Sequence, residues 1–101
     1  MIDGSEMKVD SENWFRNSHE QIPERMRGGM IRYATKGIKP GDFLTAVIDN
    51  DLWEAVKNAD AENVLLIGLY ATWFRWVAPE ECHGSRAKRI VWVQFHTAVN
   101  G

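Results

Sequence analysis

The chain has 101 residues and a mass of 11.6 kDa, which predicts one domain with a single core and leaves no room for a separate regulatory domain. Its net charge of −2 gives no global sign of nucleic-acid binding, which usually accompanies a basic domain. The longest apolar run, Val64 to Tyr70, is far shorter than the roughly 20 residues that span a bilayer. These limits predict a soluble protein without a membrane partner.

The N-terminal segment is acidic and polar, with carboxylates at Asp3, Glu6, Asp10 and Glu12. A secretory signal has the opposite pattern, a basic start followed by an apolar centre. The single cysteine, Cys82, cannot form an internal disulfide and fits a reducing compartment. We therefore expect the protein to act in the cytoplasm. We also expect residues 1–9 to be flexible because they have little to bury, and Trp14 and Phe15 to begin a short element that docks on the rest.

Helix start and stop signals follow one another from Ile22 onward. Pro23 suits the first turn of a helix, and Gly37 supplies the left-handed cap that ends it. After a turn at Pro40 and Gly41, Asp42 is expected to cap the second helix. These signals divide the first half of the chain into short helices.

The third helix is predicted from Asp51 and Glu54, which have the spacing of a capping box. Its apolar stripe contains Leu52, Trp53 and Val56. Asp60 is expected to cap the next helix, between Ala61 and Val77, where apolar residues occur nearly all the way round. Such a helix is typical of the centre of a bundle or of a subunit interface, and Pro79 should stop it.

The final apolar run, IVWVQFHTAV, fits either a strand or a helix. Its β-branched residues favour a strand, but no convincing partner strand exists in the chain, and Ser85 is a good N-cap for a helix. We therefore predict an all-α fold, a compact bundle of about four to five helices that forms one domain over residues 1–101. The fully apolar helix further predicts a homo-oligomer, with Trp73, Trp76 or Trp92 at or near the interface.

The chain contains no pattern typical of an enzyme, so we expect no catalytic residues, metal or cofactor. Cys82 and His83 are adjacent and point in different directions, so they cannot form a nucleophile and base pair. The stretch from His83 to Ser85 lacks the strand-to-helix elbow of serine hydrolases. Asp49, Asn50 and Asp51 lack the later glutamate of a calcium loop.

Two groups of cations are the best candidates for binding an anion. Arg75 lies on a helix that otherwise has no charge over more than three turns, so its guanidinium must reach solvent, a carboxylate or an anionic ligand. Arg86, Lys88 and Arg89 oppose the dipole at the start of the last helix, where backbone N–H groups also favour phosphate. The alternatives are a salt bridge at Arg75, and a solvated face or neutralisation by Glu80 and Glu81 for the cluster.

Aromatic side chains complete the predicted ligand site. Five tryptophans exceed what a core of leucine and valine requires, although a core or interface position is the favoured interpretation of each one. Tryptophan or tyrosine faces would stack on a base while arginines bind its phosphate. The predicted ligand-binding residues are Tyr33, Asn50, Arg75, Trp76, His83, Arg86, Lys88 and Arg89.

Residues 22–85 contain a series of short motifs: an R-Y pair on a helix, then G-I-x-x-G-x-F-L-x-A-V-x-x-N-D-L-x-x-A, then A-D-x-x-N, and finally A-P and G-S pairs. They fall on Arg32, Tyr33, Gly37, Ile38, Gly41, Phe43, Leu44, Ala46, Val47, Asn50, Asp51, Leu52, Ala55, Ala59, Asp60, Asn63, Ala78, Pro79, Gly84 and Ser85. In these motifs the segment resembles a family of small accessory proteins carried by bacteriophages and prophages. The sequence departs at His83, where the family pattern has an aromatic residue, and after Ser85.

The resemblance implies a small accessory protein of a mobile element in the cytoplasm of a bacterial host, and such proteins often counter host defence. Two hypotheses follow. In the first, the protein sequesters a small anionic, nucleotide-type signalling molecule. In the second, it binds a host defence protein through an acidic or apolar surface and blocks it sterically, which requires an exposed patch of several hundred Å². A structural accessory role in the phage is a third alternative.

Overall fold

The computed structural model describes residues 22–100, and the regular secondary structure in this part of the chain is all helical. Its α-helices are α2 (Glu24–Lys36), α3 (Asp42–Ile48), α4 (Leu52–Asn58), α5 (Ile67–Trp76) and α6 (Arg86–Asn100). Two 3-10 helices, η1 (Asn63–Leu66) and η2 (Glu80–Cys82), precede and follow α5. No β-strand occurs within this range, so the all-α prediction is confirmed there, including the helix chosen for the final run. The predictions for residues 1–9, Trp14 and Phe15 lie outside the described residues.

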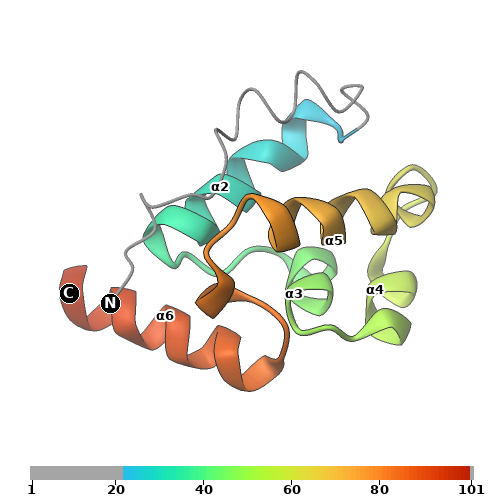
Figure 1. Ribbon diagram of the computed structural model, residues 1–101. Helices are drawn as coiled ribbons and strands as arrows, with labels where there is room; N and C mark the ends of the chain where they lie inside the picture. Colours follow the sequence, from blue (N-terminus) through green and yellow to red (C-terminus); the bar gives the residue numbers. More distant parts are fainter. Residues whose placement is uncertain (1–21, 101) are drawn as a thin grey trace.

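The helices enclose one core, with α2 and α6 on opposite sides of it. Figure 1 shows α2 along the top and α6 along the bottom, with α3 and α5 between them and α4 at the right edge beside α3. The C-terminal part of α2 lies against the middle of α6, where Trp92 donates its indole N–H to the backbone oxygen of Tyr33 at 2.8 Å. Among residues 22–100, no helix is long and apolar enough to cross a membrane.

Three of the predicted helix caps are present in the structure. Gly37 ends α2 with a φ of 66°, and its N–H donates to Tyr33 O at 2.9 Å. The carboxylate of Asp51 accepts the N–H of Glu54 at 3.1 Å at the start of α4. The hydroxyl of Ser85 accepts the N–H of Lys88 at 3.1 Å at the start of α6. All three predictions are confirmed by these hydrogen bonds. The sequence could predict the caps because each one is a contact between residues close in the chain.

Two other caps differ in detail from the prediction. The residue that caps α3 is Gly41, whose backbone oxygen accepts the N–H of Thr45 at 3.0 Å, so Asp42 is already the first helical residue. Asp60 does cap the next element, since its Oδ1 accepts the N–H of Asn63 at 2.7 Å. That element is the 3-10 helix η1 rather than the first turn of an α-helix.

The predicted single helix over 61–77 is not observed, and neither is its predicted place at the centre of the bundle, whereas the alternative of a subunit interface stays a prediction. The segment is divided into η1 and α5, and it buries only one side: Tyr70, Trp73 and Phe74 face the core, whereas Leu65 is 84% exposed and Trp76 is 55% exposed. Buried Asn63 accepts the hydroxyl of Tyr70 at 2.5 Å and holds the 3-10 turn in place. Burial raises the pKa of Tyr70 to about 12. A domain of this size has too few helices to surround α5.

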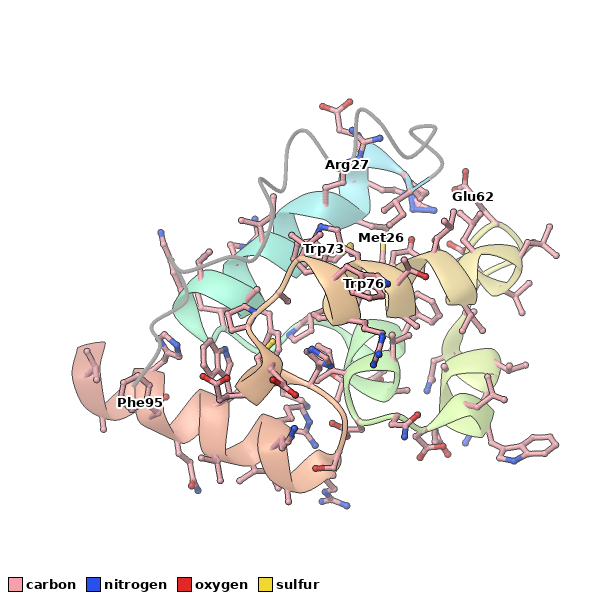
Figure 2. The ribbon with its side chains drawn as sticks, viewed as in Figure 1. Met26, Arg27, Glu62, Trp73, Trp76 and Phe95 are labelled. Carbon is pink, nitrogen blue, oxygen red and sulfur yellow. The ribbon has the colours of Figure 1, made fainter. Side chains whose placement is uncertain are left out.

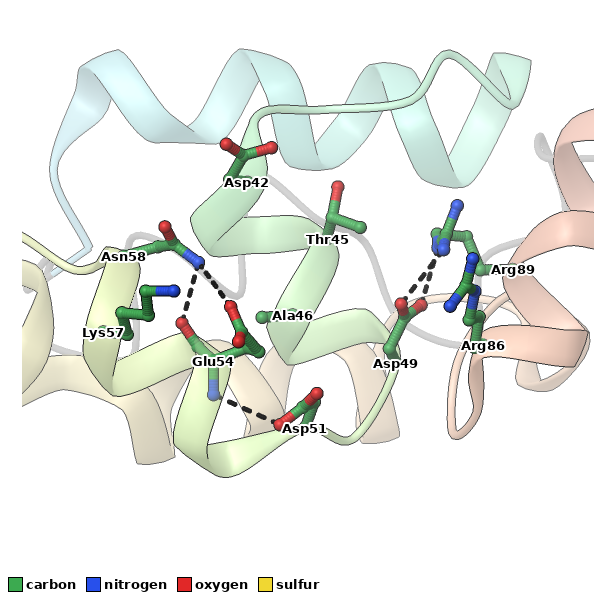
Figure 3. Close-up of a pocket in the computed structure, with 10 residues that line it drawn as sticks. All are labelled: Asp42, Thr45, Ala46, Asp49, Asp51, Glu54, Lys57, Asn58, Arg86 and Arg89. Atoms are coloured by element: carbon green, nitrogen blue, oxygen red, sulfur yellow. Dashed lines mark hydrogen bonds and ion pairs between the residues drawn. The ribbon is translucent and has the colours of Figure 1, made fainter.

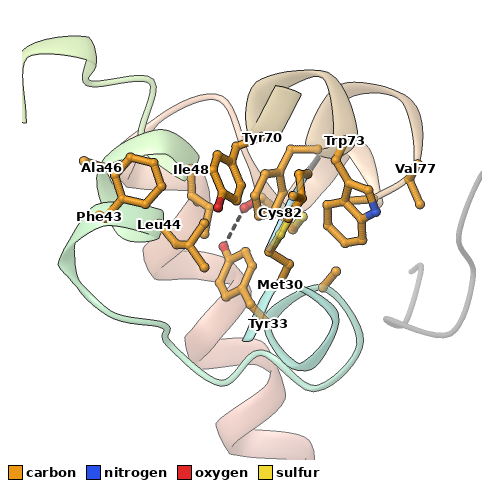
Figure 4. Close-up of a cluster of buried hydrophobic side chains, with 14 of the residues drawn as sticks. Met30, Tyr33, Phe43, Leu44, Ala46, Ile48, Tyr70, Trp73, Val77 and Cys82 are labelled. Atoms are coloured by element: carbon orange, nitrogen blue, oxygen red, sulfur yellow. Dashed lines mark hydrogen bonds between the residues drawn. The ribbon is translucent and has the colours of Figure 1, made fainter. Parts of the chain in front are cut away.

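The core contains most of the large aromatic side chains (Figure 4). Tyr33 is fully buried, and its hydroxyl donates to the backbone oxygen of Cys82, so it joins α2 to η2. Burial raises the pKa of this phenol, which therefore stays protonated. Trp73 is fully buried and Trp92 is 2% exposed, so neither can form a subunit interface. Of the tryptophans expected there, Trp76 alone remains exposed, and the homo-oligomer stays a prediction.

Candidate functional site: the charged cleft and the α4 ridge

A cleft of about 480 Å³ separates α3 and α4 from the start of α6 (Figure 3). We call it the charged cleft because most of its lining can carry charge. The lining residues are Asp42, Thr45, Ala46, Asp49, Asp51, Glu54, Lys57, Asn58, Arg86 and Arg89. Figure 3 shows Asp51, Glu54, Lys57 and Asn58 on one side, on or beside α4, and Arg86 and Arg89 on the other. Carboxylates outnumber cations in this lining, which disfavours a phosphate ligand.

Arg89 forms a two-point ion pair with Asp49 inside this cleft. Its Nε lies 2.6 Å from Asp49 Oδ1 and its Nη2 lies 3.1 Å from Oδ2. The two side chains are only 12% and 13% exposed, so solvent screens the pair little. The hydrogen bond to Asp49 raises the pKa of the guanidinium, although burial opposes it. The pair ties α6 to the end of α3 and leaves Arg89 little capacity for a ligand.

The three cations predicted to act together near the start of α6 do not converge. Arg86 is exposed and lines the charged cleft, whereas Arg89 is paired with Asp49. Lys88 lies in a separate shallow hollow with Glu80 and Glu81. Successive helical residues are turned by about 100°, so Arg86 and Arg89, three residues apart, share a face, whereas Lys88 lies about 200° around the helix from Arg86. Arg86 and Arg89 therefore meet at one cleft without Lys88, and the structure does not bring all three cations to a single site.

Arg75 and Trp76 form an exposed pair on α5. The guanidinium carbon of Arg75 lies 5.1 Å from the centre of the Trp76 ring, within the range of a cation–π contact. Figure 2 labels Trp76 on α5, on the stretch of the helix that also carries buried Trp73. Both residues of the pair are exposed. The structure thus places two of the predicted ligand residues in direct contact with each other at the surface.

The remaining predicted ligand residues have structural roles. Tyr33 is buried in the core and cannot contact a ligand at the surface. His83 is half-buried, and its ring lies 6.1 Å from that of Phe74. Asn50 has a φ of 62° and ends α3 in a Schellman motif: its N–H donates to Val47 O, and the next N–H donates to Ala46 O.

We expect Asn50→Gly to keep or slightly raise stability, by up to about 1 kcal/mol, because glycine adopts this left-handed conformation at no steric cost. A β-branched residue at this position, Asn50→Val, should instead lower stability by roughly 1–2 kcal/mol. Chemical denaturation of the three proteins measures both effects. A loss of more than about 1 kcal/mol in Asn50→Gly would show that the side-chain amide has another essential contact.

The most exposed apolar residues between residues 22 and 100 include three that lie side by side on α4. Leu52 is 60% exposed, Trp53 is 85% exposed and Val56 is 45% exposed, and we call this surface the α4 ridge. Ala55, on the other side of the helix, is only 1% exposed and packs in the core with α3. Asp51 and Glu54, which line the cleft, are the sequence neighbours of the ridge residues Leu52 and Trp53.

Sequence analysis assigned the α4 ridge to an ordinary apolar stripe and did not include it in the predicted site. The available signal was Ala55, which follows Trp53 by two residues and therefore points about 200° away from it. A short helix that buries an alanine must turn the residues opposite it toward solvent. The sequence alone could not show which side would be buried.

Within residues 22–100, no group of three or more histidine, cysteine, aspartate or glutamate side chains has a geometry that could hold a metal ion. Two of the carboxylates in the charged cleft have partners within the protein: Asp49 pairs with Arg89, and Asp51 caps α4. No protein-family model matches this chain, and no similar curated protein or solved structure was found. The site is therefore interpreted from its own geometry.

Proposed function

We propose that the protein is a non-enzymatic binding protein that docks on a protein partner through the α4 ridge. One observation carries this proposal: Trp53 is 85% exposed on an ordered helix, beside two further exposed apolar residues. Tryptophan is enriched among the interface residues that contribute most to binding, because it offers a large apolar area with few rotatable bonds. Covering this ridge would remove a contiguous apolar surface from water.

The charges around the ridge indicate the chemistry of the partner. Asp51 and Glu54 lie at its border and are exposed, and Lys57 is the nearest cation on the same helix. A partner that presents an apolar pocket for Trp53 and basic side chains at its rim would complement this surface. Charge complementarity of this kind mainly accelerates association and rejects wrong partners, whereas the buried apolar contact supplies affinity.

The resemblance to bacteriophage accessory proteins supports a host protein as the partner and steric block of a host defence complex as the effect. Steric inhibition needs tight binding and no turnover, so it requires no catalytic group. The size of the chain suits this role, because a standard interface buries about 800 Å² on each partner. We therefore prefer this hypothesis to sequestration of a nucleotide.

Sequestration of a nucleotide-type signal is the second candidate, and the contact between Arg75 and Trp76 is the observation that favours it. An exposed indole could stack on a base while the adjacent guanidinium binds phosphate. Against it, the charged cleft is rich in carboxylates and Arg89 is already paired. The two candidates use different tryptophans, so one pair of variants separates them.

We expect Trp53→Ala to weaken binding of the host target by about 30-fold or more, the equivalent of the roughly 2 kcal/mol that defines a binding hot spot. The target is first captured from host lysate on immobilised full-length protein and identified, and the purified pair is then titrated calorimetrically. Circular dichroism should show an unchanged fold, because the side chain is 85% exposed.

Trp76→Ala is the matched control, since Trp76 is also an exposed tryptophan but lies on α5. It should leave binding of the protein target within about twofold of the parent, as expected outside a hot spot. A nucleotide panel tests the alternative by thermal melting, where a ligand at 100 times its dissociation constant adds about 2.7 kcal/mol. If a nucleotide stabilises the parent and Trp53→Ala but does not stabilise Trp76→Ala, sequestration of a nucleotide replaces our proposal.

A further inference from the structure

A second hollow, of about 920 Å³, lies between the C-terminal ends of α2 and α6. We call it the α2–α6 groove. Its lining residues are Thr35, Lys36, Gly37, Ile38, Lys39, Val93, Phe95, His96, Thr97 and Val99. Ile38 is 52% exposed and Val99 is 64% exposed, and Figure 2 shows Phe95 near the end of α6. The groove thus exposes apolar side chains from α6 and from the loop that follows α2.

The floor of the groove is tightly packed. A Cβ atom built on Gly37 would lie 2.5 Å from the Cβ of His96, so the end of α2 touches α6 directly. The His96 ring packs edge-on against Trp92 at 4.6 Å and against Phe95 at 5.2 Å between ring centres. These contacts fix the spacing of the two helices. The groove is therefore a preformed surface rather than a gap that a small shift would close.

We propose that this groove receives the N-terminal segment of the same chain, with Trp14 and Phe15 as its apolar anchors. Phe15 precedes buried Ile22 by seven residues. Seven extended residues reach about 23–25 Å, whereas the 13 residues of α2 span about 20 Å. The spacer can thus run the length of α2 and place Phe15 at the groove.

Charge complementarity supports this occupant. Residues 1–13 contain four carboxylates and one lysine, whereas the rim of the groove contains Lys36 and Lys39. An acidic strand that crosses this rim would neutralise both cations. The segment is also covalently tethered, so its effective concentration at the groove is on the order of millimolar, well above that of a second molecule in solution. This inference concerns a different surface from the α4 ridge and does not depend on the proposed function.

Hydrogen exchange of the full-length chain tests the proposal. In the variant Trp14→Ala/Phe15→Ala, amides of segments 37–39 and 93–99 should exchange about tenfold faster or more than in the parent, because the anchors no longer cover them. Amides of α3 and α4 should be unaffected. The control Trp53→Ala, which removes a tryptophan side chain from an exposed site on α4, should leave exchange at the groove unchanged.

A second variant changes a residue of the groove instead of the N-terminal segment. Val99→Asp places a carboxylate at a position that is 64% exposed, so the fold should tolerate it. It should accelerate exchange in residues 10–16 by a similar factor, because both the apolar contact and the favourable charge are lost. Unchanged exchange in both variants would overturn the proposal. Protection of the groove that rises with protein concentration would assign the surface to a second copy instead.

Discussion

Replacing Gly37 by alanine should lower the free energy of unfolding by about 2–5 kcal/mol, a large share of the 5–15 kcal/mol typical of small domains. Two independent effects contribute to this loss of stability. Gly37 has a φ of 66°, where an L-residue with a Cβ costs roughly 1–2 kcal/mol. The added methyl would also lie 2.5 Å from His96 Cβ and must push α2 and α6 apart, and overpacking of this kind costs roughly 1–3 kcal/mol.

Thermal melting and urea denaturation measure this effect, and a loss in the expected range corresponds to at least about 8 °C in melting temperature. Gly68→Ala is the matched control, because no atom lies within 4 Å of a Cβ built there and the residue is inside α5. That change should raise stability by roughly 0.5–1 kcal/mol through the better helix propensity of alanine. A Gly37→Ala protein that is as stable as the parent would contradict the close contact of α2 with α6.

Removing one partner of the ion pair between Asp49 and Arg89 should cost about 2–4 kcal/mol, because the remaining charge is left largely buried. The 2.6 Å contact joins α6 to α3, and both side chains are almost nine-tenths buried. Asp49→Ala leaves an unpaired guanidinium, and Arg89→Ala leaves an unpaired carboxylate. Urea denaturation of each variant gives the cost.

The double variant Asp49→Ala/Arg89→Ala should recover part of this loss, because neither charge then remains without its partner. Arg25→Ala is the matched control: its pairs with Asp60 and Glu62 are about half exposed, so the change should cost less than about 1 kcal/mol. Costs that simply add in the double variant would show that the two groups do not interact in solution.

Most of the helix boundaries could be predicted from the sequence because they depend on local bonds. The contact from Asp51 to Glu54 spans three residues, and the N–H of Gly37 reaches back four residues to Tyr33. Such caps form wherever the residue types and spacing are right, largely independent of what surrounds them. The exception at Asp42 arose because a glycine backbone served as the cap.

The candidate site was much less predictable, because it depends on which residues face one another across the fold. Arg89 looked like an available cation until the structure placed it against Asp49, 40 residues away in the chain. Tyr33 looked like a ligand contact, but its hydroxyl bonds to Cys82, 49 residues away. Sequence spacing carries no information about such partners when the segments between them are several helices long.

Two tryptophans of the middle helices show which features are local in the sequence and which depend on the packing of the fold. The helical positions of Trp53 and Trp73 could be predicted from the sequence, because apolar periodicity and capping signals act within a few residues. That Trp73 is fully buried and Trp53 is 85% exposed became evident only from the packing of the helices. The reason is that burial depends on which face of a helix meets its neighbours, and α4 meets α3 through Ala55, which turns the opposite face toward solvent.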